Sequence, residues 1–253
     1  LAPAVQLEPP NFTHQWHNYD HTDAECLLER CAQAEIVITN KVPLSAQVLE
    51  QLPQLKLIAI PATGFNHIDL AACEKLGIQV SHVPNYAATT VSEHCLALIF
   101  ALQRHLLDYH RSVARGRWQQ SGQFCYFDYP IRDLAGSTLG LVGEGSIGLA
   151  LAQKARALGL NVIFAGRKNG TTTAGKVPFA DFLAQSDIIS LHCPLNHDTE
   201  HLLAEPEFAL MAKRPLIINT ARGGLIKSDA LVYAIQKELI RGAGIDVCES
   251  EPP

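Results

Sequence analysis

A glycine-rich turn between an apolar strand and a helix is the feature that most restricts the fold of this chain. Residues 138–142 form a short apolar run, and three glycines follow it at the spacing G-x-G-x-x-G, namely Gly143, Gly145 and Gly148. The pattern then predicts a helix over 149–158 and a second strand over 161–165. In such a β-α-β unit the glycines allow a tight turn, close approach of a pyrophosphate and close packing of helix on strand. We therefore predict a dinucleotide-binding site.

The start of that helix is the part of the motif that would hold the diphosphate. A helix N-terminus presents unpaired N–H groups and partial positive charge, so an anion can sit on it. The cofactor-binding residues that the motif predicts are Gly143, Gly145, Ser146, Ile147 and Gly148.

Strands alternate with helices on both sides of a boundary near residues 84–90, which predicts two parallel sheets. Before the boundary, we expect strands over 35–39, 55–60 and 78–80, and helices that begin near residues 23, 45 and 68. From residue 138 onward we expect at least five parallel strands, the last three over 188–191, 216–220 and 244–247, with helices over 206–211 and 228–239. The expected fold is α/β, with a smaller flavodoxin-like substrate domain over 1–82 and a doubly wound, Rossmann-type dinucleotide domain over 83–253.

A long, almost continuously apolar segment follows the boundary. Residues 91–109 predict one interdomain helix that is buried on most sides, between domains or between subunits. We interpret it as the interface of a homodimer. The segment 115–130 is predicted to be a loop with several aromatic residues, which either covers a cleft or forms an interface patch.

Composition excludes some partners. The formal net charge of −5 argues against a nucleic-acid or anionic-membrane surface, and no apolar run reaches the length of a membrane span. The seven cysteines include no C-x-x-C pair, which is typical of reduced thiols in a cytoplasmic protein. Because the chain begins at Leu1 and ends at Pro253, we expect it to be a piece of a longer polypeptide.

The end of the second strand bears on which nicotinamide cofactor is bound. NAD sites usually carry an acid there that accepts hydrogen bonds from the ribose 2′-hydroxyl, whereas this chain has Gly166, Arg167 and Lys168. An arginine can pair with a 2′-phosphate in a bidentate geometry. We predict that NADP is preferred and NAD is possible, with Arg167 in the site. The alternative is that both cations are solvated loop residues.

Two further strand ends carry polar residues. Arg222 follows the strand over 216–220 and two small residues, Thr220 and Ala221, so it is expected at the carboxyl edge of the sheet, where it can grip a carboxylate and polarise a carbonyl. Asp246 is expected inside the last strand and bonded to a specific partner, since an unpaired acid there is costly. Glu251, just beyond, is predicted to orient a histidine and raise its pKa.

Several motifs together resemble one family. GEGSIG, HCPLNHDTEHLL, INTARGGLI and GAGIDVCESEPP resemble the D-isomer-specific 2-hydroxyacid dehydrogenases, most closely the glycerate dehydrogenase / hydroxypyruvate reductase branch. The segments ATGFNHIDLAACEKLGIQV and VPNYAATTVSEH are similar to the family's substrate-domain loop and interdomain segment, so the likeness covers nearly the whole chain.

The resemblance implies roles for matching positions. Arg222 would bind and polarise a 2-oxo acid, Glu251 would support the acid/base histidine, and Asp246 would hold the nicotinamide carboxamide. Backbone groups of Thr63 and Gly64 would receive the substrate carboxylate. The positions that would line the cofactor are Cys193, Pro194, Thr199, Thr220 and Ala221.

None of the eleven histidines matches the family's catalytic histidine, which lies beyond Glu251. His192, His197 and His201 have a loosely ligand-like spacing, but they are expected at a strand end and in a loop. A family-type loop beside the cofactor is therefore favoured over a zinc site, and no metal is predicted. His94, on the apolar helix, is expected to be a hydrogen-bonded core residue.

The predicted function is hydride transfer between NAD(P)H and a small 2-oxo acid such as hydroxypyruvate or glyoxylate. The alternatives are another member of the family, such as a D-lactate or phosphoglycerate dehydrogenase, and a cofactor-sensing binding module that resembles the family's corepressors.

Overall fold

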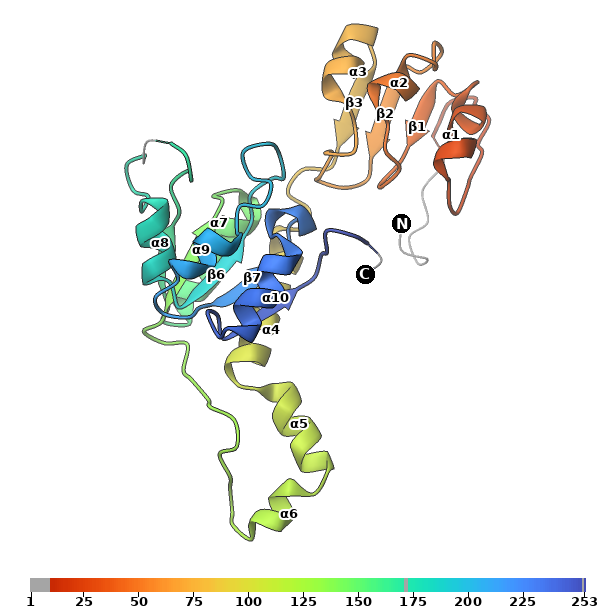
Figure 1. The fold of residues 1–253 in the computed structure, drawn as a ribbon. Coiled ribbons are helices and arrows are strands. Elements are labelled where there is room, and N and C mark those ends of the chain that lie inside the picture. The colour runs from red at the N-terminus through yellow and green to blue at the C-terminus, as the bar shows by residue number, and fades with distance from the viewer. Residues whose placement is uncertain (1–9, 171–172, 252) are drawn as a thin grey trace. The chain divides into compact units, whose positions relative to one another are not determined.

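The computed structural model describes residues 10–170, 173–251 and 253. It divides into two compact units, Leu1–Tyr86 and Ala87–Pro253, which are described separately below (Figure 1). The division falls close to the boundary expected after residue 82. Among the described residues, no helix has the length and apolar character that crossing a membrane requires.

The first unit is a three-stranded parallel sheet with the order β1-β2-β3. Its strands are β1 (Ile36–Ile38), β2 (Leu57–Ile60) and β3 (Gln79–His82), and its helices are α1 (Ala24–Cys31), α2 (Ala46–Leu49) and α3 (Leu70–Leu76). The central strand β2 buries Ile58 and Ile60 against apolar residues of the helices. At α3, the Asp69 side chain accepts a hydrogen bond from the Ala72 N–H, and Gly77 ends the helix at φ 73°.

The second unit contains a five-stranded sheet, all parallel, with the order β5-β4-β6-β7-β8. The strands are β4 (Thr138–Val142), β5 (Asn161–Phe164), β6 (Ile188–Leu191), β7 (Leu216–Asn219) and β8 (Gly242–Ile245). The helices that follow β4 are α7 (Ser146–Ala157), α8 (Phe179–Gln185), α9 (Glu205–Ala209), the 3₁₀ turn η1 (Gly223–Leu225) and α10 (Ser228–Gln236). The predicted five parallel strands are confirmed. Helix α8 had not been expected.

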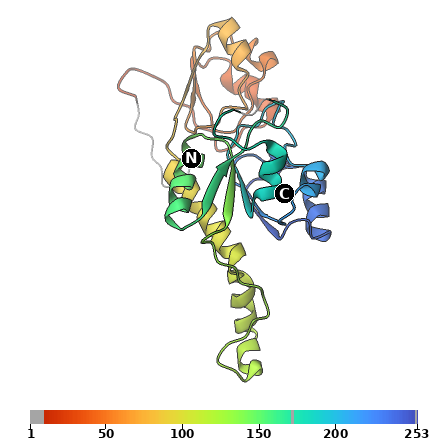
Figure 2. The ribbon, with the colours of Figure 1, turned by 90° about the vertical axis from the view of Figure 1, so that its left-hand side faces the viewer.

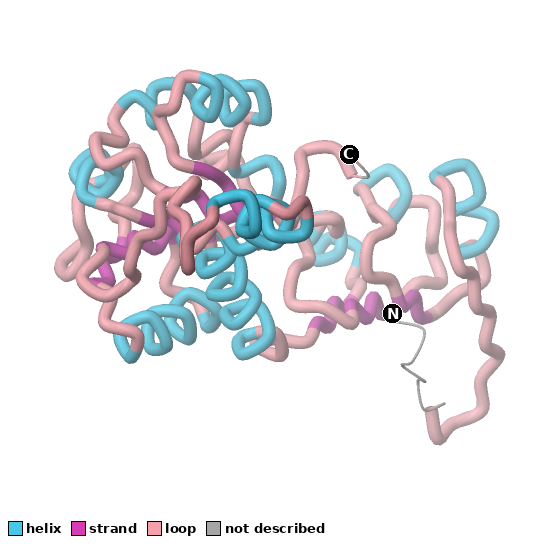
Figure 3. The backbone as a smooth tube through the Cα atoms, turned by 90° about the horizontal axis from the view of Figure 1, so that it is seen from below, coloured by secondary structure: helices cyan, strands magenta, loops and turns pink. Residues whose placement is uncertain are grey.

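Helices cover both faces of this sheet (Figure 3). Successive residues of β6 and β7 alternate between two apolar clusters. Ile188 and Ile218 pack with α7 and with α4 (Ala88–Gln103), whereas Ile189 and Ile217 pack with α8, α9 and α10. All residues of both strands are buried, as central strands of a doubly wound sheet require.

The expected single helix over 91–109 is wrong. It is two helices, α4 (Ala88–Gln103) and α5 (Leu106–Ala114), because His105 adopts a left-handed conformation with φ 49° and its ring pairs with Asp108. Within this unit α4 buries one face, against α7 and the sheet, and is not covered on most sides.

Beyond that break the chain extends away from the sheet. We call residues 105–131 the arm; it contains α5 and α6 (Arg117–Ser121), so the segment 115–130 is partly helical and not the expected continuous loop (Figure 2). A bidentate ion pair between Arg117 and Asp128, with distances of 2.6 and 2.9 Å, links α6 to the segment in which the arm returns to the sheet.

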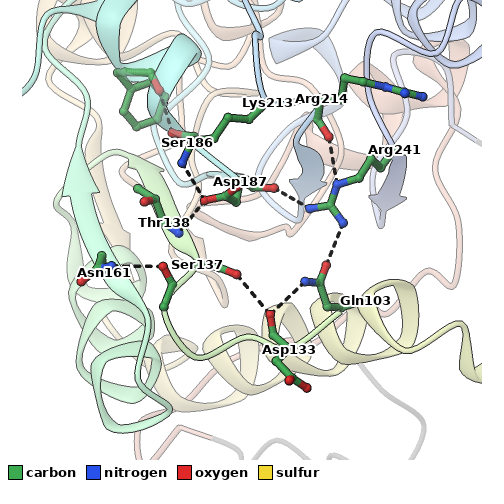
Figure 4. Close-up of polar contacts among 12 residues, drawn as sticks. Gln103, Asp133, Ser137, Thr138, Asn161, Ser186, Asp187, Lys213, Arg214 and Arg241 are labelled. Atoms are coloured by element: carbon green, nitrogen blue, oxygen red, sulfur yellow. Dashed lines mark hydrogen bonds and ion pairs between the residues drawn. The ribbon is translucent and has the colours of Figure 1, made fainter. Parts of the chain in front are cut away.

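A partly buried polar network fixes the base of the arm to the sheet (Figure 4). The Arg241 guanidinium donates at 3.0 Å to the Gln103 side chain and to the backbone carbonyls of Asp187 and Arg214. Gln103, the last residue of α4, donates in turn to the Asp133 carbonyl, where the chain returns from the arm. Burial lowers the pKa of Arg241. The network therefore joins the amino end of the sheet to both ends of the arm.

Candidate functional site

The carboxyl ends of β4 and β6 lie at the point where the strand order changes direction. β5 pairs with one side of β4 and β6 with the other, so the connections leave this point on opposite faces, which is where open α/β sheets form their ligand-binding crevice. Here the His192 N–H donates to the Val142 carbonyl at 2.7 Å. Gly143 has φ 110°, and a Cβ there would lie 2.7 Å from the backbone carbon and oxygen of His192. Only glycine fits this turn.

The other two glycines of the motif differ in their surroundings. A Cβ at Gly148 would lie 2.3 Å from the Gly143 carbonyl oxygen, so this glycine lets α7 pack closely on the turn. A Cβ at Gly145 would meet no heavy atom within 4 Å. Helix α7 begins at Ser146, three residues before the expected start, so Ser146, Ile147 and Gly148 form its first turn, with N–H groups that have no helical partners. The open space at Gly145 beside these donors fits a diphosphate.

The two cations after β5 have different surroundings. Lys168 forms an ion pair of 2.8 Å with the buried Glu207 and donates to the Leu202 carbonyl, so its interpretation as a solvated loop cation is wrong. Arg167 is exposed, and no ion pair involves it within the part of the chain that the structure describes. Of the two, Arg167 is the cation that is accessible to a ligand.

The segment after β6 contributes one wall of the crevice. Burial lowers the pKa of His192 to about 4 and raises that of Cys193 to about 11, so both are neutral near pH 7. The Thr199 hydroxyl donates to the Pro194 carbonyl at 2.6 Å and accepts from the Asn196 N–H. Thr199 therefore holds the 194–199 turn together. No cluster of potential metal ligands occurs among the described residues.

His192 makes the stability of the fold dependent on pH. Between pH 6.5, which is the ordinary pKa of histidine, and about pH 4, which is the pKa of His192 in the folded protein, the His192 side chain is protonated in the unfolded chain but neutral in the folded chain. The free energy of unfolding is therefore expected to fall as pH drops from 6.5 to 4, by at most about 3 kcal/mol from this group. In His192→Gln, which can keep the hydrogen bond to Ser190, urea unfolding at pH 7 and pH 4.5 should show a smaller difference. His197→Gln, at a fully exposed site, is the control; equal differences in all three proteins would contradict the assignment.

The turn after β7 is shaped by a buried asparagine that sequence reasoning did not single out. The Asn219 side chain accepts from the Ala221 N–H at 3.1 Å and donates to the Arg222 carbonyl at 2.9 Å. The Thr220 hydroxyl is 3.3 Å from the buried Cys95 thiol. Arg222 is half-buried, and its guanidinium donates to the Ala221 carbonyl at 2.6 Å. The turn thus presents two small residues and an oriented guanidinium at the sheet edge.

Two expectations for the end of β8 are wrong. The strand ends at Ile245, so Asp246 lies beyond it, with 53% of its side chain exposed, and not inside the strand. His94 is likewise no core residue, because its side chain is 46% exposed and its Nε2 lies 3.4 Å from the Asp246 carboxylate. The specific partner of Asp246 is thus His94. The Asp246 N–H also donates to the Asn219 carbonyl, which fixes the strand end beside the Arg222 turn.

Glu251 accepts a hydrogen bond from the Cys248 N–H at 3.0 Å. Among the described residues, no ion pair joins a histidine to Glu251; the histidine pair in this segment is His201 with Glu249, at 2.7 Å. The pKa of Glu249 is lowered mainly by hydrogen bonding to the Ser228 side chain, with smaller contributions from the Ser228 N–H and from His201.

Thr63 and Gly64 belong to the first unit, in the loop after β2. The Thr63 hydroxyl donates to the Val83 carbonyl at 2.9 Å, and its own carbonyl is 3.1 Å from the His82 ring nitrogen. Thr63 and Gly64 are therefore not placed relative to the residues of the second unit. The second unit alone brings together the glycine turn, the 192–199 segment, the Arg222 turn and Asp246.

A doubly wound sheet with a glycine cradle at its switch point defines a dinucleotide-binding protein. Comparison with known proteins narrows the class. Residues 96–253 match the family described as D-isomer specific 2-hydroxyacid dehydrogenase, NAD binding domain. The chain belongs to this family of oxidoreductases, as its motifs indicated.

Three individual likenesses support the assignment. The chain is 46% identical to the glycerate dehydrogenase of Methylorubrum extorquens, over 96% of this chain and 77% of that protein. It resembles the structure of the D-lactate dehydrogenase of Aquifex aeolicus in complex with NAD and lactic acid, with a TM-score of 0.78, 33% identity, and coverage of 88% and 67%. It also resembles the acyclic imino acid reductase Bsp5 in complex with NADPH and D-Arg, with a TM-score of 0.82, 30% identity, and coverage of 92% and 75%.

Proposed function

We propose that this protein reduces a small 2-oxo acid, hydroxypyruvate or glyoxylate, at the expense of NAD(P)H. The observation that carries the proposal is the Arg222 turn. It lies at the carboxyl edge of the sheet beside Thr220 and Ala221, and Asn219 and the Ala221 carbonyl set its geometry. The similarity to a glycerate dehydrogenase supports a three-carbon substrate, since oxidation of glycerate at C2 yields hydroxypyruvate.

The cofactor would lie across the switch point. The diphosphate would sit on the first turn of α7, at Gly143, Gly145, Ser146, Ile147 and Gly148. The surfaces that would line the rest of the cofactor come from Cys193, Pro194, Thr199, Thr220 and Ala221, and Asp246 would accept a hydrogen bond from the carboxamide. The buried, neutral Cys193 suits a contact surface better than a nucleophile.

The reaction divides into binding, polarisation and proton transfer. A bound nicotinamide supplies the hydride. Arg222 would hold the substrate and stabilise negative charge that develops on the carbonyl oxygen. Backbone groups of Thr63 and Gly64, in the unit that we assign as the substrate domain, would receive the carboxylate. Glu251 would raise the pKa of the acid/base histidine that the family resemblance places after it.

Cofactor preference is proposed to depend on Arg167. In Arg167→Ala, we expect the Kd for NADPH to rise about 10-fold to 100-fold, because one charge-assisted pair to the 2′-phosphate is lost. The Kd for NADH should stay within about twofold. Quenching of protein fluorescence measures both constants. Arg156→Ala, which removes an exposed cation from the other end of α7, is the control. Equal loss of both affinities would contradict the preference for NADP.

We also propose a homodimer formed through the arm. One face of α4 packs against its own unit, whereas the arm beyond it exposes several large apolar side chains: Phe124 and Phe127 are 90% and 81% exposed, and Leu107 is 61% exposed. Exposed large apolar side chains of this kind are typical of an interface when they gather in one patch. Sedimentation at micromolar concentration should give a dimer, and Leu107→Glu with Phe127→Glu should give a folded monomer. A monomeric parent protein would contradict the proposal.

The function is tested with the full-length protein and a panel of 2-oxo acids. Loss of nicotinamide absorbance should be fastest with hydroxypyruvate or glyoxylate and slower with pyruvate. Preference for a phosphorylated substrate would contradict the choice, because the 61–67 loop contains His67 as its single basic residue.

A further inference from the structure

The segment 246–251 carries two residues of the proposed site, Asp246 and Glu251, but it is outside regular secondary structure. It contacts the Arg222 turn through backbone: a Cβ at Gly223 would lie 2.0 Å from the Cys248 carbonyl carbon and oxygen. This close contact leaves no room for a side chain at position 223, but it does not by itself hold the 246–251 segment in place. The Asp246 end of the segment is held by its N–H bond to the Asn219 carbonyl, so another group must fix the end that carries Glu251.

Glu249 supplies that anchor, because its two carboxylate oxygens contact two other segments of the sheet edge. One oxygen is 2.7 Å from the His201 ring, and the other accepts from the Ser228 N–H at 2.6 Å. His201 belongs to the segment after β6, and Ser228 begins α10 after β7. Glu249 therefore links the segments that follow three neighbouring strands.

The contact to Ser228 places an anion at the N-terminus of α10. The residue at the cap position, Lys227, offers no side-chain capping bond, so Glu249 caps the helix from a distant part of the sequence. The partial positive charge of the helix end favours the carboxylate there. The titratable groups at this helix end are His201, which contacts Glu249, and Lys227 with its neighbours Glu205 and Asp229.

The contact to His201 is equally well supported. The His201 N–H donates to the Gly224 carbonyl at 2.8 Å, and a parallel bridge joins Leu203 to Ile226. These bonds hold the backbone around His201 against the Arg222 turn, so its ring offers a fixed partner to Glu249. Each carboxylate oxygen of Glu249 thus contacts a residue whose backbone is held in place by its own hydrogen bonds.

We propose that Glu249, with His201, is a positioning pair that fixes Glu251 relative to Arg222. This inference rests on the proposed function, because the pair affects the reaction only through the role proposed for Glu251. When the pair is broken, Glu251 moves away from the acid/base histidine, and the histidine loses the carboxylate that raises its pKa.

The test is the pH dependence of kcat/KM for reduction by the full-length enzyme. Reduction requires the protonated histidine, so kcat/KM falls as pH rises through its pKa. Glu249→Ala and His201→Ala should each move this alkaline limb to lower pH by about half a unit or more, and Glu249→Gln by less. Simple destabilisation lowers the amount of active enzyme but leaves the position of the limb unchanged.

Two further variants separate the outcomes. Glu251→Gln is the positive control and should move the limb at least as far. Lys227→Ala removes the neighbouring exposed pair with Glu205 and should leave the limb in place. A limb that Glu251→Gln moves but Glu249→Ala does not would overturn the positioning role alone. Absence of turnover in the parent enzyme would overturn the proposed function, and this inference with it.

Discussion

Replacing Arg222 with glutamine is expected to lower kcat/KM for the 2-oxo acid by about 1,000-fold. Glutamine keeps a donor at a similar place but loses the positive charge that stabilises the developing alkoxide and the planar fork that grips a carboxylate. Since Arg222 lies in a turn that Asn219 shapes independently, the fold should be preserved. Steady-state rates with hydroxypyruvate, together with a Kd for NADPH, measure the two effects separately.

The Arg222 prediction has an internal control. Arg222→Lys retains charge without the fork and should lose activity less severely than Arg222→Gln. The Kd for NADPH should stay within about twofold in both variants. A loss of less than about tenfold in Arg222→Gln would place the guanidinium outside the reaction.

Replacing Gly223 with alanine is expected to have the largest effect on folding. The added Cβ would lie 2.0 Å from two backbone atoms of Cys248 and 2.5 Å from the Glu249 nitrogen, and backbone cannot yield as a flexible side chain does. The segment 246–251 must move, so we expect a loss of about 3 kcal/mol or more in the free energy of unfolding. Urea unfolding measures it, and turnover should fall in parallel because Asp246 and Glu251 move with the segment.

Gly145→Ala is the matched comparison. Its Cβ would meet no heavy atom, and its φ of −69° suits alanine, so unfolding should change by less than about 1 kcal/mol. Cofactor affinity should nevertheless fall, because the methyl group occupies the place assigned to the diphosphate. Equal unfolding free energies in the two alanine variants would contradict the packing argument for Gly223.

Much of the fold could be predicted because its strands are short apolar runs bounded by turn residues. The runs 138–142 and 188–191 match β4 and β6 residue for residue, since central strands are buried on both faces and consist mostly of apolar residues. Gly77 and Gly159 mark helix ends by adopting the left-handed conformation that few other residues tolerate. These signals are local and strong.

The errors occurred where tertiary contacts decide the outcome. The break at His105 has no glycine or proline to announce it, and its left-handed backbone places the ring against Asp108. Asp246 lies beyond its strand because β8 begins two residues earlier than the apolar run suggested.

The partners of two residues near the site could not be predicted from any spacing in the sequence. The carboxylate that contacts a histidine is Glu249 and not Glu251, and its partner His201 lies 48 residues away in the chain. The partner of Asp246 is His94, which comes from a different element, α4. Pairings at this separation are set by the fold and not by a local pattern.

We propose that this protein transfers hydride between a nicotinamide and C2 of a small acid. The most direct measurement uses the full-length protein with hydroxypyruvate and NADPH, and determines both the amount and the configuration of the product. We predict one equivalent of D-glycerate for each NADPH oxidised, with the reaction lost in Arg222→Gln. Tight NADPH binding without turnover of hydroxypyruvate, glyoxylate or any other small 2-oxo acid would contradict the account.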